Sequence, residues 1–156
     1  LRINLILNGL EDKIKLFPVA LGVAKHVAEF AFDHVNTGAS HLATITPEDE
    51  VPGRETTTTS NIVPLDSLLD QINFNKDNRI FVKIDVEGME EKVLLGAKKF
   101  LQTYPNILIV IESKHSGRER LAQVLQEIAD FEILEVDDMN MGARKITDKT
   151  QNHADT

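Results

Sequence analysis

The sequence predicts an α/β fold with a mostly parallel sheet and helices on both of its faces. The main observation is a series of short apolar runs, Ile80 to Val86, Ile107 to Ile111 and Phe131 to Val136, with a helical pattern in each interval. The second run, ILIVI, has no polar position, which is typical of a strand buried on both faces. Strands and helices that alternate at such short spacing favour parallel strands joined by right-handed crossovers.

The two intervals between these runs predict amphipathic helices. In the first, Glu87 to Leu101, apolar residues recur at helical spacing, acidic residues open the segment, and Lys98 and Lys99 lie near its end, as the helix dipole favours. In the second interval, Ser116 with Glu119 three residues later predicts a capping box. The apolar stripe that follows it is formed by Leu121, Val124, Leu125 and Ile128.

The part of the chain before Ile80 predicts shorter elements with more turns between them. Asn8-Gly9 tolerates a left-handed helix end, and Pro18 cannot donate a hydrogen bond within a strand. The expected elements are a helix ending at Asn8-Gly9, a strand over Ile14 to Ala20, an extended segment from His26 to Asp33, a loop from Asn36 to Arg54, a strand over Thr56 to Val63 and a short helix after Pro64.

The composition limits the class of protein. With 156 residues, of which 42% are apolar, the chain can bury one core, so we expect a partial domain over residues 1–145 and a polar tail over 146–156. A net charge of -8 without a basic patch disfavours binding to nucleic acid. The absence of cysteine excludes disulfides and thiolate chemistry. No apolar run approaches the roughly 20 residues that span a bilayer.

Two predicted strands end in acidic residues, Asp85 and Glu112. In open α/β sheets, ligands bind outside the carboxyl ends of the strands. A carboxylate there can accept a hydrogen bond from a ribose or substrate hydroxyl, bind an ammonium group or act as a general base. The alternative for Asp85 is that it caps the helix that follows.

Lys83 interrupts an apolar strand and lies on the same strand face as Asp85. Because an unpaired buried lysine is unfavourable, we expect Lys83 either to emerge at the sheet edge or to pair with Asp85 or Glu112. His115 lies in a predicted loop, where it either carries a proton or is solvated. The helix dipole accounts for the acidic residues around Glu87, so no metal site is expected.

The segment FVKIDVEGMEEKVLLGAKKFL, followed by PNILIVIE, resembles the signature of FkbM-type methyltransferases. Three earlier pieces fit the same family in the same order, NLILNGLEDKIKLFPVALG, NTGAS and VPLDSLL. Together these pieces cover most of residues 4 to 113. The ordered set is more specific than any one of its motifs.

This resemblance implies a Rossmann-like fold whose seven-stranded sheet binds S-adenosylmethionine along the ends of its first four strands. It implies methyl transfer to a hydroxyl of a sugar, polysaccharide or polyketide-type acceptor, and from the cofactor we expect a cytoplasmic protein. The candidate catalytic residues are Asp85, Lys83 and Glu112. The candidate cofactor-binding residues are Val19, Ala20 and Leu21, expected near the adenine, with Asp85 and Glu87.

The sequence departs from the family at its amino-terminal end. It contains neither the glycine-rich turn after the family's first strand nor the acidic residue that ends the second, so we expect these two strands to be missing. They would lie between the third and fourth strands, which leaves one edge of the Ile80 to Val86 strand unpaired. The first residues, LRINLILNGL, are accordingly expected to end a helix that begins upstream, and the fragment is expected to be inactive alone.

Two other functions remain open at this point. The first is a non-catalytic accessory or interaction domain derived from a methyltransferase, and a start codon near Leu1 would favour it. The second is a hydrolase that uses Asp85 and Glu112 with a divalent metal. The expected partner of the enzyme is a small-molecule or carbohydrate acceptor, neither nucleic acid nor membrane is expected, and a homo-oligomer is left open.

Overall fold

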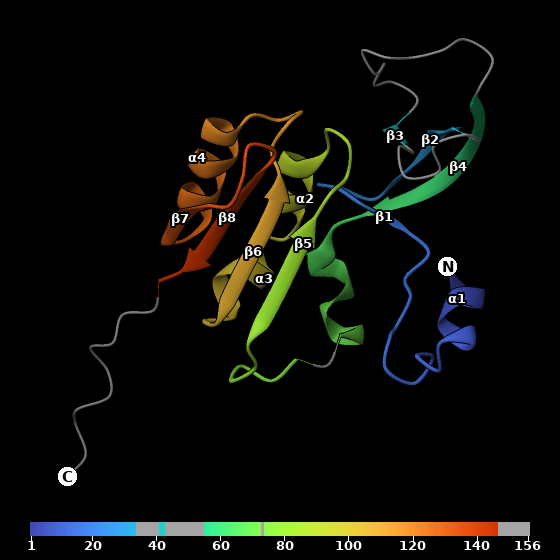
Figure 1. Ribbon diagram of the computed structural model, residues 1–156, viewed down its shortest axis with the longest axis horizontal. Helices are drawn as coiled ribbons and strands as arrows, with labels where there is room; N and C mark the ends of the chain where they lie inside the picture. The colour runs from blue at the N-terminus through green and yellow to red at the C-terminus, as the bar shows by residue number, and fades with distance from the viewer. Residues whose placement is uncertain (34–40, 43–54, 73, 147–156) are drawn as a thin grey trace.

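The computed structural model describes residues 1–33, 41–42, 55–72 and 74–146. Within these ranges the chain forms two mixed four-stranded sheets, with strand orders β1-β4-β2-β3 and β5-β6-β8-β7 (Figure 1). The elements are α1 (Arg2–Leu7), β1 (Ala20–Leu21), β2 (His26–Asp33), β3 (His41–Leu42), β4 (Glu55–Val63), the 3-10 helix η1 (Leu65–Gln71), β5 (Ile80–Ile84), α2 (Glu90–Gly96), α3 (Lys98–Thr103), β6 (Ile107–Glu112), α4 (Arg118–Ile128), β7 (Phe131–Glu135) and β8 (Asn140–Lys145).

The second sheet contains the three strands that the apolar runs predict, together with one strand that we did not predict. β5 and β6 pair in parallel, and β8 pairs antiparallel with both β6 and β7. β7 therefore runs in the same direction as β5 and β6, but β8 separates it from β6. The short β7–β8 connection, in which Asp137 accepts from the backbone N–H of Met139 and Asn140, permits only antiparallel pairing. This sheet is therefore mixed, and the described residues do not confirm the expected mostly parallel sheet.

The first sheet confirms two of the expected strands and corrects a third. β2 and β4 are the strands that the sequence predicts there, and they pair antiparallel from His26 with Ile62 to Asp33 with Glu55. The strand expected over Ile14 to Ala20 is reduced to Ala20–Leu21, since Pro18 has no N–H and Val19 donates to the carbonyl of Phe17 in a tight turn at 2.8 Å. The loop expected from Asn36 to Arg54 lies outside the described residues apart from β3.

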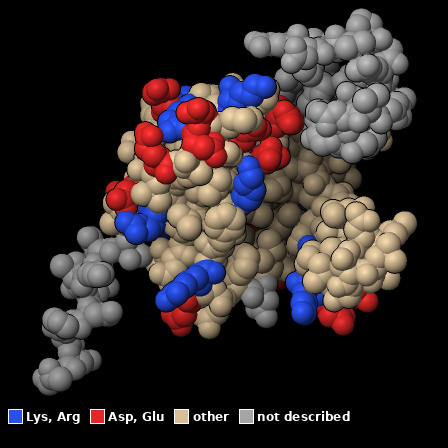
Figure 2. All heavy atoms as spheres, in the orientation of Figure 1, with Lys and Arg blue, Asp and Glu red and all other residues tan. Residues whose placement is uncertain are grey.

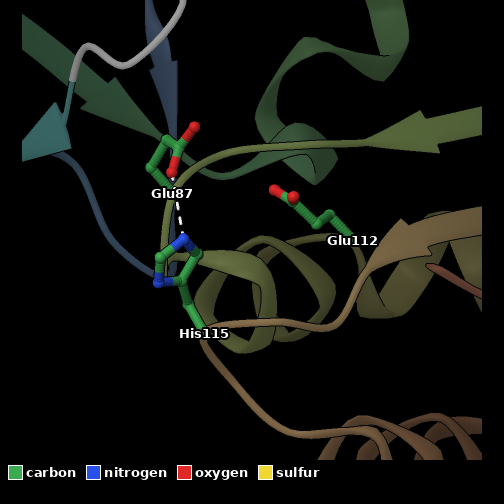
Figure 3. Close-up of side chains that lie close together, drawn as sticks. All are labelled: Glu87, Glu112 and His115. Carbon is green, nitrogen blue, oxygen red and sulfur yellow. Dashed lines mark ion pairs between the residues drawn. The ribbon is translucent and has the colours of Figure 1, made fainter. Parts of the chain in front are cut away.

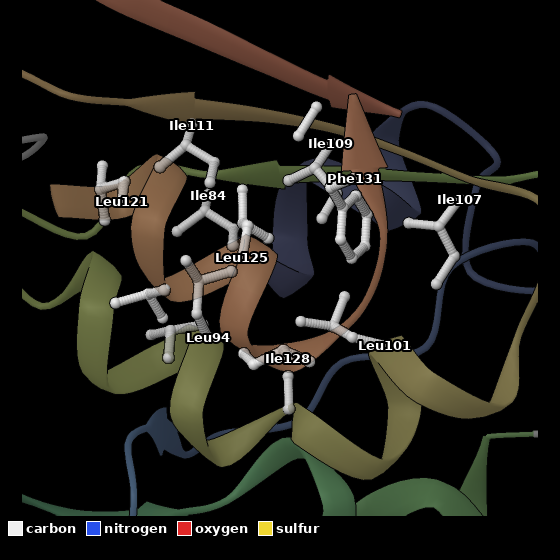
Figure 4. Packing of buried hydrophobic residues seen from close by; sticks show 14 of the residues in the cluster. Ile84, Leu94, Leu101, Ile107, Ile109, Ile111, Leu121, Leu125, Ile128 and Phe131 are labelled. Carbon is white, nitrogen blue, oxygen red and sulfur yellow. The ribbon is translucent and has the colours of Figure 1, made fainter. Parts of the chain in front are cut away.

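The hydrophobic core lies between the second sheet and the helices α2, α3 and α4, which cover one face of that sheet (Figures 1 and 4). Both the sheet and the helices contribute fully buried residues, for example Ile109 from β6, Leu94 from α2 and Leu125 from α4. None of the described helices is long and apolar enough to cross a bilayer.

The opposite face of the second sheet has no helical cover among the described residues, which therefore do not confirm the expected helices on both faces. Phe81 is 64% exposed and its cross-strand partner Leu108 is 39% exposed, and Figure 2 shows a largely uncharged surface over the strands. The reason is that β1 and η1 pack against α2 and α3 instead of against this face. Among the described strands, β5 pairs only with β6, which agrees with the unpaired edge expected for it.

The helix expected over Glu87 to Leu101 is divided at Ala97 into α2 and α3. Lys98 and Lys99 therefore begin α3 instead of ending a longer helix. The amino terminus of α3 is capped from η1, since both carboxylate oxygens of Asp66 accept backbone N–H groups, from Lys99 and Phe100, at 2.8 Å.

The carboxyl terminus of α3 is capped from β8. The ammonium group of Lys145 donates to the carbonyls of Leu101, Gln102 and Tyr104 at 2.7 to 2.9 Å. Burial lowers the pKa of Lys145. A carboxylate at its start and an ammonium group at its end match the dipole of this short helix.

The two halves of the described chain meet at Gly96, the last residue of α2. A Cβ atom at this position would lie 2.0 Å from the carbonyl oxygen of Gly22 and 3.3 Å from the Cα of Pro64. Gly22 follows β1 and Pro64 follows β4, so only glycine allows α2 to approach the end of the first sheet this closely.

Replacing Gly96 with alanine is expected to destabilise the protein by about 1 to 3 kcal/mol, because the new methyl group overlaps the Gly22 carbonyl. Helix propensity alone predicts the opposite sign, a gain of about 1 kcal/mol. Urea unfolding followed by circular dichroism measures the change, with Lys92→Ala on the exposed side of α2 as the control. An alanine variant as stable as the wild type would show that this contact is not close.

Candidate functional site

Acidic side chains meet where β5 and β6 end. The last pair between these two strands is Ile84 with Ile111, so Asp85 and Glu112 come next at the same edge of the sheet. In Figure 2 acidic groups gather along this edge and over α4, with some basic groups among them. The structure therefore brings together the two carboxylates that sequence reasoning singled out.

Lys83 pairs with Asp85, which was one of the two arrangements expected for it. Its Nζ atom lies 3.3 Å from the carboxylate of Asp85 and donates to Oδ1 of Asn140 at 3.3 Å. Both members of the ion pair are about half exposed, at 44% and 51%. Asp85 does not cap the following helix, because the N-cap position of α2 is Met89 and no side chain caps it.

Glu87 and His115 lie opposite each other in the turns that follow β5 and β6. The Nε2 atom of His115 is 3.1 Å from a carboxylate oxygen of Glu87. Glu112 reaches toward the same place from the end of β6, and one ligand atom from each of the three residues lies within 4.8 Å of the others (Figure 3). The sequence placed Glu87 and Glu112 in one cleft, but it did not predict that His115 joins them.

The turn that carries Glu87 is unusual in its backbone. Glu87 has φ 49° and Gly88 has φ 92°, so two successive residues occupy the left-handed region, which is unfavourable for glutamate. The carboxylate of Glu90 stabilises this turn, because one of its oxygens accepts the N–H of Gly88 at 3.0 Å.

Glu90 also reaches the loop before α4. Its second carboxylate oxygen accepts the hydroxyl of Ser116, and the side chain is completely buried. Ser116 is thereby occupied with Glu90, and the expected capping box is wrong, since α4 has Gly117 as its N-cap and no side-chain cap. Sequence reasoning missed Glu90, although it lies three and four residues before the buried Val93 and Leu94 and so shares their helix face.

The pKa of Glu112 is raised above its ordinary value. Burial is the largest cause, followed by a hydrogen bond with Asp85 and by the negative charges of Asp85 and Glu87, while His115 acts in the opposite direction. Three carboxylates in one place make the last of them hard to ionise. A carboxyl group of this kind is suited to exchanging a proton with a ligand.

Of the three residues expected near the adenine, Leu21 lines a pocket together with residues of β5. Ala20 and Leu21 form β1, and Val19 directly precedes them. Leu21 and Lys83 line the same pocket, which is almost wholly apolar and has a volume of about 90 Å³. Ligand pockets for molecules of cofactor size are larger, at about 300 Å³ or more.

Asp85 and Glu112 stand at the carboxyl ends of adjacent parallel strands, the place where ligands bind in open α/β sheets. A family model of the methyltransferase FkbM domain matches residues 2–140. Because this match covers most of the 156 residues, the chain belongs to the FkbM methyltransferase family. Neither a curated protein nor a solved structure matches the chain.

Replacing Glu90 with alanine is expected to destabilise the protein by about 3 kcal/mol, since it leaves the N–H of Gly88 and the hydroxyl of Ser116 without their charged acceptor. Glu91→Ala is the matched control, because Glu91 is partly exposed and pairs with Arg120 at the surface. Thermal unfolding measures stability, and amide hydrogen exchange at Gly88 reports on the turn. If both variants unfold alike, Glu90 does not hold these loops.

Replacing Glu112 with glutamine is expected to stabilise the protein at pH 7 in buffer containing EDTA. The raised pKa means that the folded state disfavours the ionised carboxylate, so the wild type is destabilised above the folded pKa. The difference between variant and wild type should shrink as the pH falls, and vanish below about 4.3, where the carboxyl group is neutral in both states. Unfolding curves across this pH range measure the difference.

Glu132→Gln is the control for this experiment. Glu132 lies on the exposed side of β7 and pairs with Arg144, so removing its charge should not stabilise the protein. If Glu112→Gln lowers stability at pH 7, favourable contacts of the ionised Glu112 outweigh its repulsion from Asp85 and Glu87.

Proposed function

We propose that this chain belongs to an S-adenosylmethionine-dependent enzyme that methylates a hydroxyl group on a sugar, polysaccharide or polyketide-type acceptor in the cytoplasm. The observation that carries the proposal is the match of the FkbM domain over residues 2–140. The carboxylates at the ends of β5 and β6 support it, because they stand where α/β enzymes bind their ligands.

Within this proposal, Glu112 and Asp85 act on the acceptor. A hydroxyl group must lose its proton as it attacks a methyl group, and a carboxylate with a raised pKa is a better proton acceptor than an ordinary one. Lys83 acts as the partner of Asp85, since the 3.3 Å ion pair orients that carboxylate. The remaining requirement is to position the acceptor and exclude water.

The described residues do not fit the whole cofactor. The pocket beside β5 holds about 90 Å³, and Lys83 is the only charged residue in its lining. The proposed fold is therefore a Rossmann-like sheet in which further strands extend β5 at its free edge and complete the pocket. On this proposal Val19, Ala20 and Leu21 supply one apolar wall for the adenine, Glu87 lies at the other end of the cofactor, and the 156-residue chain is inactive alone.

Isothermal titration calorimetry with S-adenosylhomocysteine tests this proposal. We expect no saturable binding by the 156-residue chain, since the pocket that Leu21 and Lys83 line holds only about 90 Å³, and micromolar or tighter binding by a chain extended at the amino terminus, where the gene encodes one. Leu21→Asp in the extended chain should weaken binding at least tenfold, and Val27→Asp, at an exposed position of β2, should not.

A second candidate function is a non-catalytic accessory or interaction domain, which the small pocket and the one-sided pairing of β5 favour. If neither the short nor the extended chain binds S-adenosylhomocysteine, this candidate replaces the enzyme. Methyl transfer by the 156-residue chain would contradict the claim that it is inactive alone.

A further inference from the structure

Three potential metal ligands lie close together at the carboxyl ends of β5 and β6 in the second sheet. Glu87 comes from the turn after β5, Glu112 from the end of β6, and His115 from the loop before α4 (Figure 3). The set is not a purely acidic one, because the imidazole Nε2 of His115 points at a carboxylate oxygen of Glu87 at 3.1 Å. Three segments of the chain therefore supply two oxygen donors and one nitrogen donor to one place.

The spacing of these donors is close to that around a bound ion. Carboxylate oxygen and imidazole nitrogen bind first-row divalent ions at about 2.0 to 2.2 Å, so two ligand atoms on one ion lie up to about 4.4 Å apart. The three donor atoms already lie within 4.8 Å of one another. Small side-chain rotations are enough to close this difference.

The charges around the cluster favour a cation. In the part of the chain that the structure describes, Lys83 forms its ion pair with Asp85, and none of the ion pairs with a basic group involves Glu112. A positive ion beside Glu112 would relieve the repulsion from Asp85 and Glu87. The side chains of Glu87 and His115 are 29% and 37% exposed, so water can reach an ion and complete its coordination.

Glu90 holds the loops that carry two of these ligands. Glu90 bonds to Gly88, the neighbour of Glu87, and to Ser116, the neighbour of His115. The two loops that carry these ligands are therefore tied together through one buried carboxylate before any ion arrives. A site whose ligands are already positioned loses less conformational entropy when it binds.

We propose that Glu87, Glu112 and His115 bind one first-row divalent cation, Mn²⁺ or Zn²⁺ in preference to Mg²⁺ or Ca²⁺. The imidazole sets this preference, because Mg²⁺ and Ca²⁺ select oxygen ligands. The site replaces the expectation that the chain binds no metal, and it makes Glu87 an ion ligand. It goes beyond methyl transfer, since it requires neither cofactor nor acceptor.

Titration of the tag-free 156-residue chain with MnCl₂ and ZnCl₂, followed by calorimetry and by the loss of the free Mn²⁺ electron paramagnetic resonance signal, tests the proposal. We expect one saturable site, at least tenfold weaker binding of MgCl₂ and CaCl₂, and at least tenfold weaker Mn²⁺ binding in Glu112→Gln and in His115→Asn. The matched controls Glu132→Gln and His26→Asn, which alter exposed residues elsewhere, should bind Mn²⁺ as the wild type does.

Nuclear magnetic resonance of the wild type keeps the test decisive if a variant fails to fold. Substoichiometric Mn²⁺ should broaden the amide signals of Glu87, Glu112 and His115 and leave those of β7 sharp. Broadening centred elsewhere, wild-type affinity in His115→Asn, or no saturable binding would overturn the proposal. Because no cofactor is present, none of these outcomes depends on whether S-adenosylhomocysteine binds.

Discussion

The candidate site depends on the buried carboxylate of Glu90. A fully buried charge is strongly unfavourable unless hydrogen-bond donors surround it, and Glu90 obtains them from Gly88 and Ser116. These donors belong to two loops that are separated in the chain by all of α2, α3 and β6. The geometry between Glu87 and His115 is therefore a consequence of a third residue, which bonds to the backbone N–H of Gly88 beside Glu87 and to the hydroxyl of Ser116 beside His115.

The sequence predicts the strands that need little tertiary context. β5, β6 and β7 are compact apolar runs, and β2 and β4 are rich in residues that favour strands. β8 could not be found in this way, because Asn140 to Lys145 contains a glycine and two basic residues and buries only its middle positions. Its strand conformation comes from pairing with β6 and β7 on both sides. The division of the long helix at Ala97 is also tertiary, since Asp66 caps the new helix from η1.

The candidate site was partly predictable for a similar reason. Asp85 and Glu112 end apolar runs, and parallel neighbouring strands must bring such residues to the same edge. The pairing of His115 with Glu87 depends on two loops whose conformations no periodicity encodes. Glu90 did carry a signal, because a charged residue on the apolar face of a helix must find donors inside the protein. The helix dipole also favours an acidic residue in this first turn, so the sequence offers a second explanation for Glu90 that needs no buried donors.

The capping of α3 ties the folding of distant segments to one another. A six-residue helix is too short to form in isolation, because nucleation is unfavourable and few backbone bonds follow it. Its first N–H groups are satisfied only after η1 has docked, and its last carbonyls only after β8 has entered the sheet. Because α3 is capped by η1, which precedes it in the sequence, and by β8, which follows it, we expect these three segments to fold together in one cooperative step.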